Sequence, residues 1–392
     1  MRPLEGITVI ALEHAVAAPF ATRQLADLGA RVIKIERPNV GDFARDYDET
    51  VKGMSSHFVW LNRSKESFTL NLKHARAVQI LERLLERADI LIQNLAPGAA
   101  RRLGLGAESV LPKYPRLIVC DISGYGENGP YASKKAYDLL VQAEAGVLSV
   151  TGTADTPSKV GISIADIATG MYAYSGILTA LYQREKSGKG TRMEVTMLEA
   201  LTEWMGYPLY YTHFGGTAPA RTGPNHASIV PYGRYETGDG KSIMLGLQNE
   251  REWAVFCEKV LLQPELAQDP RYGSNSRRAA KRSEIIALIT EVFATLTAEQ
   301  LIERLDASGI ANARMNTPDE VWEHPQLKGR DRWREMDSPV GLLAMLLPPV
   351  TMPGFEARID AVPALGEHTE HILSGFGYTS GDIVALRRAG VV

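Results

Sequence analysis

The chain has 392 residues, of which 45% are hydrophobic, which is enough to bury a large core and predicts two domains. The formal net charge of −3 argues against a nucleic-acid-binding protein, so an anionic ligand would need a local group of basic residues. Cys120 and Cys257 exclude a disulfide framework and favour a reducing, cytoplasmic environment. The sequence MRPLEGITVIALEHA has no signal-peptide pattern, and no run approaches about 18 apolar residues, so we expect no membrane span.

Short apolar runs alternate with segments of helical periodicity at the start of the chain. Strands are predicted at 6–12, 31–36, 89–94 and 116–123. A helix is predicted at 18–29, between the first two strands, and a linker, the segment SFTLNLK (67–73) and a helix at 78–88 follow the second strand. This alternation predicts an α/β fold with a mostly parallel, doubly wound sheet. Ligands of such sheets bind at the carboxyl ends of the strands, where Arg37, Asn94 and the loop after Ser123 fall.

The rest of the chain is expected to hold long helices and a second, smaller unit. Helical patterns continue over 136–200, and the Gly- and Pro-rich residues 214–227 are interpreted as a linker. A smaller α/β unit is predicted at 228–325, beginning with a hairpin whose turn is Gly-Asp-Gly. Residues 330–392 begin with strand-like pieces and end in the helix GDIVALRRAG.

Three local signals do not support a nucleotide or metal enzyme. The first strand–helix turn reads EHAVAAPFAT and lacks the glycines that let a backbone approach a pyrophosphate. SGKGT at 187–191 follows a helix instead of opening one, so it is interpreted as a helix C-terminus. HTEH at 368–371 offers two histidines without an evident third ligand, so we predict no metal site.

Asp166 stands alone among small and apolar residues in GISIADIATG, at the start of a long helical stretch. One interpretation is a helix N-cap, because Asp is a favoured cap residue. The other is a carboxylate nucleophile at a helix N-terminus, where N–H groups and the helix dipole hold the anion and stabilise an oxyanion. The local sequence does not separate the two.

A series of segments along the chain carries a family resemblance. In order these are VIKIERPNVGDFAR, LNRSKESFTLNLK, QNLAPGAARRLGLG, GYGENGPYASKKAYD, ISIADIATG, SGKGTRMEVTMLEA and LGEHT. The series resembles the family III CoA-transferases over nearly the whole chain. The resemblance implies an interlocked homodimer, a large Rossmann-like domain built from 1–213 and 330–392, and a small α/β domain at 228–325.

The same resemblance implies a mechanism without a resident cofactor or metal. Asp166 attacks an acyl-CoA thioester and passes through an anhydride to an aspartyl-CoA thioester, from which CoA moves to an acceptor carboxylate. This preserves the thioester's free energy and requires a site that excludes water. Carried over by position, the CoA-contacting residues are Arg37, Leu70, Lys73, Asn94, Leu95, Arg102 and Lys135, with Tyr137 and Asp138 lining the same region. Four of these side chains are cationic, as CoA phosphates require.

Two departures from the family pattern narrow the choice of reaction. Val16 and Ala17 stand where formyl-CoA transferase carries a Gln, which disfavours formyl transfer. Ala136 stands where a methyl-branched acyl-CoA racemase carries the His that pairs with its Asp, which favours transfer over racemisation. A racemase and a non-catalytic CoA-binding protein of the same fold remain the alternatives.

The acceptor is expected to be a short dicarboxylate. WLNRSKES, ARTGPNHASIVPYG and the absent Gln resemble the branch that pairs succinyl-CoA with itaconate, mesaconate, citramalate or malate. A second carboxylate needs a cationic partner, and Arg63, Arg221 and His226 are the candidates.

Overall fold

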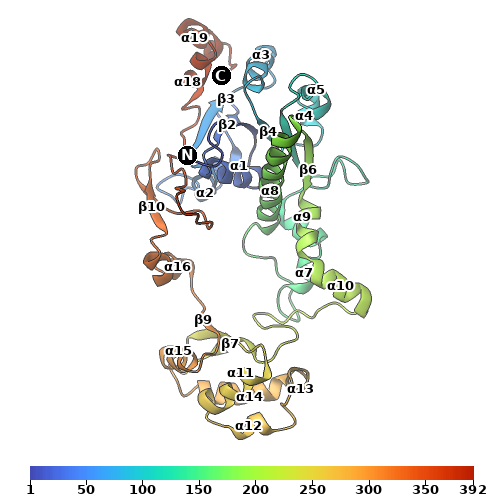
Figure 1. The fold of residues 1–392 in the computed structure, drawn as a ribbon, viewed down its shortest axis with the longest axis vertical. Helices are drawn as coiled ribbons and strands as arrows, with labels where there is room; N and C mark the ends of the chain where they lie inside the picture. The colour runs from blue at the N-terminus through green and yellow to red at the C-terminus, as the bar shows by residue number, and fades with distance from the viewer. The chain divides into compact units, whose positions relative to one another are not determined.

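The computed structural model describes residues 1–392, and the chain divides into two compact units (Figure 1). Unit 1 comprises 1–147, 160–207 and 330–392, and unit 2 comprises 148–159 and 208–329. Each unit is described by itself below. The linker and domain limits expected from the sequence stay predictions.

Unit 1 is built on a six-stranded parallel sheet with the order β3-β2-β1-β4-β5-β6. The strands are β1 (Thr8–Leu12), β2 (Arg31–Glu36), β3 (Lys65–Thr69), β4 (Ile90–Gln93), β5 (Ile118–Ser123) and β6 (Arg192–Thr196). This is the order of doubly wound dinucleotide-binding folds, whose ligands bind at the carboxyl edge of the sheet. The predicted parallel α/β sheet is confirmed. β6 was not predicted, because its alternating charged residues RMEVT give no apolar run.

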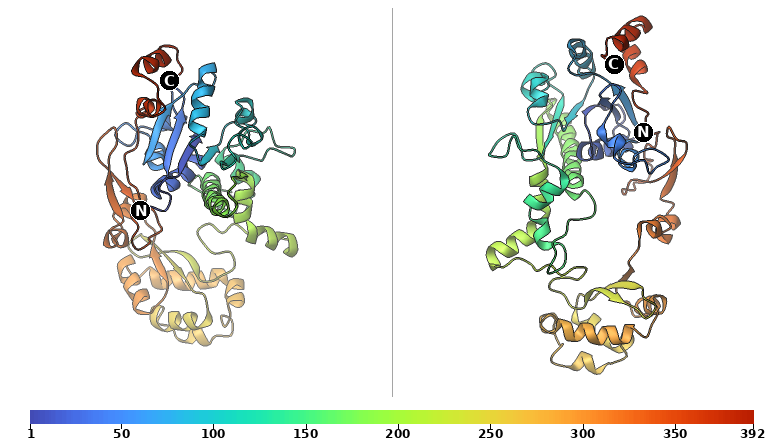
Figure 2. Two further views of the ribbon diagram at one scale, coloured as in Figure 1. Left: turned by 45° about the horizontal axis from the view of Figure 1, so that its top comes forward. Right: turned by 180° about the vertical axis from the view of Figure 1, so that it is seen from behind.

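Helices cover both faces of this sheet (Figure 2). Successive side chains of β1 point to opposite faces, so Ile10 and Leu12 belong to one buried cluster and Val9 and Ala11 to another. The first cluster is closed by α3 (Ala75–Leu85), α18 (Thr369–Gly375) and α19 (Ser380–Arg388), and the second by α1 (Ala17–Asp27) and α8 (Ile164–Ser187). The end of the chain therefore returns to the sheet beside β3, as Figure 1 shows.

Shorter elements complete unit 1. They are the 3-10 helix η1 (Phe43–Asp46), α2 (Ser56–Asn62), α4 (Ala99–Arg102), α5 (Ala107–Val110), α6 (Asp138–Glu144), α9 (Met197–Trp204) and the hairpin β10 (Trp333–Met336)–β11 (Leu343–Leu346). α7 (Val147–Val150) and α10 (Gly206–Gly215) contain the points where the chain passes between the units. SGKGT does follow a helix, since Gly188 ends α8 at φ 70°.

Unit 2 packs helices around a three-stranded sheet. Its strands are β7 (Tyr232–Glu236), β8 (Ser242–Gly246) and β9 (Asn312–Arg314), and its helices are α11 (Glu250–Val255), the π-helical turn η2 (Phe256–Val260), α12 (Glu265–Gln268), α13 (Asn275–Ala280), α14 (Arg282–Phe293), α15 (Ala298–Ala307), α16 (Pro318–Trp322) and α17 (Pro325–Gly329). β7 and β8 form the predicted hairpin. Trp253, Phe256, Ile289 and Leu301 are buried at its centre.

The helices were also compared with the length and composition of a membrane span. No single helix meets both criteria, although α14 and α15, which meet at a bend of 110°, would meet them if taken as a pair.

Candidate active site

Asp166 lies in the first turn of α8, where its side chain keeps partial access to solvent. Ser163 is the N-cap residue, so Asp166 is the third residue of the helix and its interpretation as the cap is wrong. The helix is held in place by close packing on α1. A Cβ added to Gly170 would lie 2.7 Å from the carbonyl oxygen of Ala17, so the two helices approach at a residue without a side chain.

The N–H groups of the first turn of α8 are all used within the chain. Those of Ile164 and Ile167 donate to backbone carbonyl groups at 2.8 and 3.0 Å. The carboxylate of Asp138 accepts the other two, from Ala165 at 2.8 Å and from Asp166 at 3.4 Å. These N–H groups are therefore not free to hold the Asp166 carboxylate or an oxyanion. The nucleophile interpretation from the sequence had assumed that they were.

The charge of Asp166 is poorly compensated. Burial, and after it the negative charge of Asp138, raises the pKa of Asp166 to about 7, and no hydrogen bond to its carboxylate offsets them. Burial also raises the pKa of Tyr47 to about 12, with further contributions from Asp42, Asp166 and Tyr137 in that order. Tyr47 therefore lies within electrostatic reach of Asp166, and Tyr137 lies within electrostatic reach of Tyr47. A carboxylate with this pKa changes its charge close to neutral pH.

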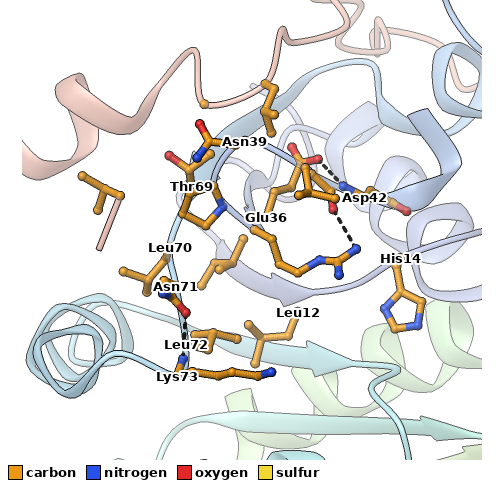
Figure 3. Close-up of a pocket in the computed structure, with 18 of the residues that line it drawn as sticks. Leu12, His14, Glu36, Asn39, Asp42, Thr69, Leu70, Asn71, Leu72 and Lys73 are labelled. Carbon is orange, nitrogen blue, oxygen red and sulfur yellow. Dashed lines mark hydrogen bonds between the residues drawn. The ribbon is translucent and has the colours of Figure 1, made fainter. Parts of the chain in front are cut away.

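A cavity of about 1200 Å³ opens at the carboxyl ends of β1, β2 and β3 (Figure 3). Five residues that the family resemblance marked as CoA contacts line it: Arg37, Leu70, Lys73, Leu95 and Arg102. Leu70 is buried, whereas the three cationic side chains are exposed and available to an anionic ligand. The cavity therefore combines an apolar wall with positive charge at the edge where doubly wound sheets bind ligands.

The C-terminal LGEHT element forms part of the same wall. The hydroxyl oxygen of Thr369 accepts the N–H of Thr69 at 3.0 Å. A Cβ on Gly366, which has φ 69°, would lie 3.1 Å from the Thr69 side chain. Nδ1 of His368 accepts the N–H of Ser67 at 3.2 Å, so HTEH ties the start of α18 to β3. No group of His, Cys, Asp or Glu side chains suited to a metal ion is found.

Buried ion pairs support the floor of the cavity. Nζ of Lys34 lies 2.8 Å from Oδ2 of Asp42 and 3.4 Å from Oε1 of Glu13, and Nζ of Lys65 lies 2.7 Å from the same glutamate oxygen. Both ammonium groups are fully buried, and burial lowers the pKa of Lys65 to about 8. Because a buried charge that loses its partner is costly, this network fixes the loop after β1 against η1.

η1 connects the cavity with the surroundings of Asp166. Phe43 begins η1 and lines the cavity, and its ring centroid lies 4.9 Å from that of His14. Tyr47 follows η1, with its ring centroid 5.7 Å from that of Phe43. Because the negative charge of Asp166 contributes to the raised pKa of Tyr47, we place η1 between the cavity and the surroundings of Asp166. His14 and Phe43 were not predicted as site residues, although they lie in the quoted segments EHAVAAPFAT and VIKIERPNVGDFAR, because an uncharged aromatic side chain there gave no signal of its own.

Four other predicted CoA contacts lie outside the lining of this cavity. Asn94 donates to the carbonyl oxygen of His14 at 2.9 Å and accepts its N–H at 3.0 Å, so it joins the end of β4 to the loop after β1. Lys135 and Tyr137 are exposed. Asp138 holds the start of α8, as described above.

The cations expected at an acceptor carboxylate have partners of their own. The guanidinium group of Arg63 is buried and binds both carboxylate oxygens of Asp27 at 2.8 and 2.7 Å. In unit 2, Arg221 donates to the carbonyl oxygen of Thr153 at 2.9 Å, and Nδ1 of His226 accepts backbone N–H groups. Arg63 is therefore a structural residue, because its guanidinium is not free for a substrate.

Comparisons with known proteins agree with this geometry. The family model CoA-transferase family III matches residues 4–369. The succinyl-CoA:glutarate CoA-transferase of Mus musculus is 34% identical over 100% of this chain and 91% of its own length, and the succinyl-CoA–D-citramalate CoA-transferase of Chloroflexus aurantiacus is 30% identical over 100% and 98%. A crystal structure of a CaiB/BaiF family protein from Brucella suis has a TM-score of 0.85 at 31% identity, covering 95% of this chain and 99% of that one.

The fold, the cavity and the partly buried carboxylate of Asp166 thus fit one class of acyl-transfer enzymes, and the chain belongs to it. This protein is a family III CoA-transferase, and its substrates are CoA thioesters. The predicted enzyme class is confirmed, and the alternative of a non-catalytic protein is set aside.

Proposed function

We propose that the protein moves CoA from succinyl-CoA to a short dicarboxylate through covalent intermediates on Asp166. The observation that carries the proposal is a carboxylate without a hydrogen-bond partner at the start of α8, with its pKa raised to about 7 by burial and by Asp138. At pH 7 about half of such groups are ionised, and the anion is poorly solvated, which makes it a strong nucleophile for a carboxylate.

The reaction balances without a cofactor. Asp166 attacks the thioester carbonyl and expels CoA thiolate, leaving an anhydride between Asp166 and the donor acid. The thiolate attacks the aspartyl carbonyl, releasing the donor carboxylate and forming aspartyl-CoA. The acceptor carboxylate attacks this thioester and again expels the thiolate, which then attacks the acceptor carbonyl of the second anhydride. The products are the new acyl-CoA and free Asp166.

The cavity is the proposed binding site for CoA. Arg37, Lys73 and Arg102 provide the positive charge that its phosphates need, and Leu70 and Leu95 provide apolar contact. η1 and its aromatic side chains then lead the pantetheine chain from the cavity towards Asp166. Lys135 and Tyr137, which are exposed, are proposed to meet the ligand near the nucleophile.

The active enzyme is proposed to be the interlocked homodimer that the family resemblance implies, acting in the cytoplasm. α10 supports a second copy, because its apolar side chains are exposed in the single chain: Tyr210 by 71% and Phe214 by 78%. A helix that buries none of its residues is unusual on a monomer. A partner chain would also help to exclude water from the anhydride.

The acceptor is proposed to be a dicarboxylate such as glutarate, citramalate, itaconate or mesaconate. A panel of these acids, with acetate and butyrate as monocarboxylate controls, is incubated with succinyl-CoA and the new thioesters are measured by mass spectrometry. We expect at least one dicarboxylate to react, with Asp166→Asn slower than wild type by roughly a thousandfold or more. Transfer to monocarboxylates alone, or wild-type rates in Asp166→Asn, would contradict the proposal.

A further inference from the structure

We propose that Asp138 is a positioning residue for CoA transfer, which occupies the start of α8 and thereby keeps the carboxylate of Asp166 free to attack an acyl group. The inference rests on the proposed role of Asp166. It assigns Asp138 a different task from the CoA contact that the family resemblance implied.

The geometry forms a clamp between three segments. Asp138 is the first residue of α6, and its Oδ1 accepts the N–H groups of Ala165 and Asp166. Its Oδ2 accepts Nε2 of Gln142 at 2.7 Å. Gln142 is fully buried, and its Oε1 accepts the N–H of Val160 at 2.9 Å. The side chains of α6 thus hold both the start of α8 and the segment that leads into it.

Because of this clamp, the carboxylate of Asp138, and not that of Asp166, accepts the N–H groups at the start of α8. Ser163, the N-cap residue, makes no side-chain cap, so the two N–H groups would otherwise be unpaired. Without Asp138 they could turn to Asp166, whose carboxylate would become better stabilised and therefore less basic and less nucleophilic. Asp138 itself sits at the N-terminal ends of both α6 and α8, where helix dipoles favour a negative charge.

The other charged groups on elements packed against α8 are engaged elsewhere. They are Arg23 and Asp27 on α1, paired at 2.7 Å; Asp121 on β5 and Arg192 on β6, paired at 2.8 Å; Glu194 on β6, which accepts the N–H of Glu127; Glu199 on α9, which accepts the hydroxyl of Thr196; and Glu144 on α6, which pairs with Lys134. Glu203 on α9 is exposed to solvent. Tyr47 also senses Asp166, and it is uncharged at neutral pH. Asp138 is therefore the charge that acts on Asp166 from its neighbours.

The test compares Asp138→Asn with wild type in the full-length enzyme. Asn keeps the size and the Oδ1 acceptor, removes the charge, and places an NH2 donor where Oδ2 accepts Nε2 of Gln142. With succinyl-CoA as donor, kcat and kcat/KM are measured from about pH 5.5 to 9. We expect the midpoint of the acid limb to fall by about one pH unit and kcat at high pH to fall roughly tenfold, with the donor KM unchanged. A purely structural cap would leave the midpoint where it is.

Asp382→Asn is the matched control, because Asp382 also lies in the first turn of a helix, α19, and its exposed carboxylate accepts the N–H of Thr379. It should change neither midpoint nor kcat. Gln142→Leu provides a second variant should Asp138→Asn fail to fold, since it removes the donor that orients Asp138, and it should also lower kcat roughly tenfold.

Two results would overturn the inference: an unchanged midpoint in a folded Asp138→Asn, or a raised donor KM with unchanged kcat, which would make Asp138 a CoA contact. An unchanged kcat in Gln142→Leu would do so if only that variant folds. Failure of the proposed function is a separate result, because it appears as full activity of Asp166→Asn whatever Asp138 does.

Discussion

The carboxyl group of Asp166 lies in surroundings that disfavour its negative charge. Its neighbours take it partly out of water, and the N–H groups that could have stabilised it are bound to Asp138. Nucleophiles and acid–base groups often have pKa values shifted in this way, because the same burial that destabilises the charge makes it reactive. The reactivity that we propose for Asp166 therefore follows from its immediate neighbours.

A stability measurement tests directly whether the buried charge of Asp166 destabilises the fold. Its folded-state pKa of about 7 lies above the unfolded value, so the buried charge costs most above pH 7 and the cost disappears as the pH falls towards the unfolded pKa. Asp166→Asn should therefore raise the stability at pH 8 by on the order of 2 kcal/mol, allowing for partial exposure, and by less at pH 5. Thermal unfolding at both pH values measures this.

Asp155→Asn is the control, because Asp155 is exposed. It should leave the melting temperature unchanged at either pH. A stabilisation by Asp166→Asn that is equal at both pH values would show that the charge of Asp166 is not what costs stability.

At the scale of single residues, the quoted motifs contain some side chains that the fold brings to the cavity and others that it uses elsewhere, and the role of the former in binding CoA stays a prediction. Arg37 and Lys73 belong to quoted motifs, and both lie at the cavity. Arg63 also belongs to one, yet it pairs with Asp27, which is 36 residues away and which no local pattern connects to it. Arg387 lines the cavity from the last helix, where nothing in the sequence distinguished it from surface charge.

Among the elements, α1 and α8 decide where Asp166 stands. They meet across Gly170, which belongs to the ATG that follows the helical turn containing Asp166. A Cβ there would lie 2.7 Å from a backbone oxygen and 2.9 Å from the ring of Phe20, so one helix would have to shift. The tight approach explains a glycine inside a helix, where it otherwise costs about 1 kcal/mol relative to Ala.

Gly170→Ala should therefore lower both stability and activity. We expect a loss of about 1–3 kcal/mol in unfolding free energy from overpacking and a fall in kcat of at least tenfold, because the displaced helix carries Asp166. Chemical denaturation and initial rates measure the two effects. Gly375→Ala in α18, where an added Cβ meets nothing within 4 Å, should be neutral or slightly stabilising. Equal behaviour of the two variants would contradict this account of the packing.

For the whole molecule, the sequence predicted the class of fold because parallel strands buried on both faces are continuous apolar runs. GITVIAL, RVIKIE and DILIQN stood out for this reason, and β1, β2 and β4 lie within them. β6 was missed because it is the last strand of the sheet and carries charged residues. The return of α18 and α19 to the sheet beside β3 has no local signal, and only the family resemblance pointed to it.

The exposed apolar side chains of α10 lead to a prediction about assembly. If a second copy covers them, the protein in solution should have twice the chain mass of 43.0 kDa at low micromolar concentration. Sedimentation velocity or mass photometry measures this. Replacing Tyr210 and Phe214 with Ser should weaken the dimer, while replacing Val78, an exposed residue of α3, should not. A stable monomer with full activity would contradict the prediction.

The central claim is that Asp166 carries the transferred groups covalently, and trapping tests it most directly. Wild-type enzyme is mixed with succinyl-CoA in the absence of acceptor, treated with hydroxylamine or borohydride, digested and examined by peptide mass spectrometry. We predict that the peptide containing Asp166 changes mass to that of the hydroxamate or the reduced alcohol, and that Asp166→Asn shows neither product. Full transfer activity with an unmodified Asp166 peptide under these conditions would contradict the account.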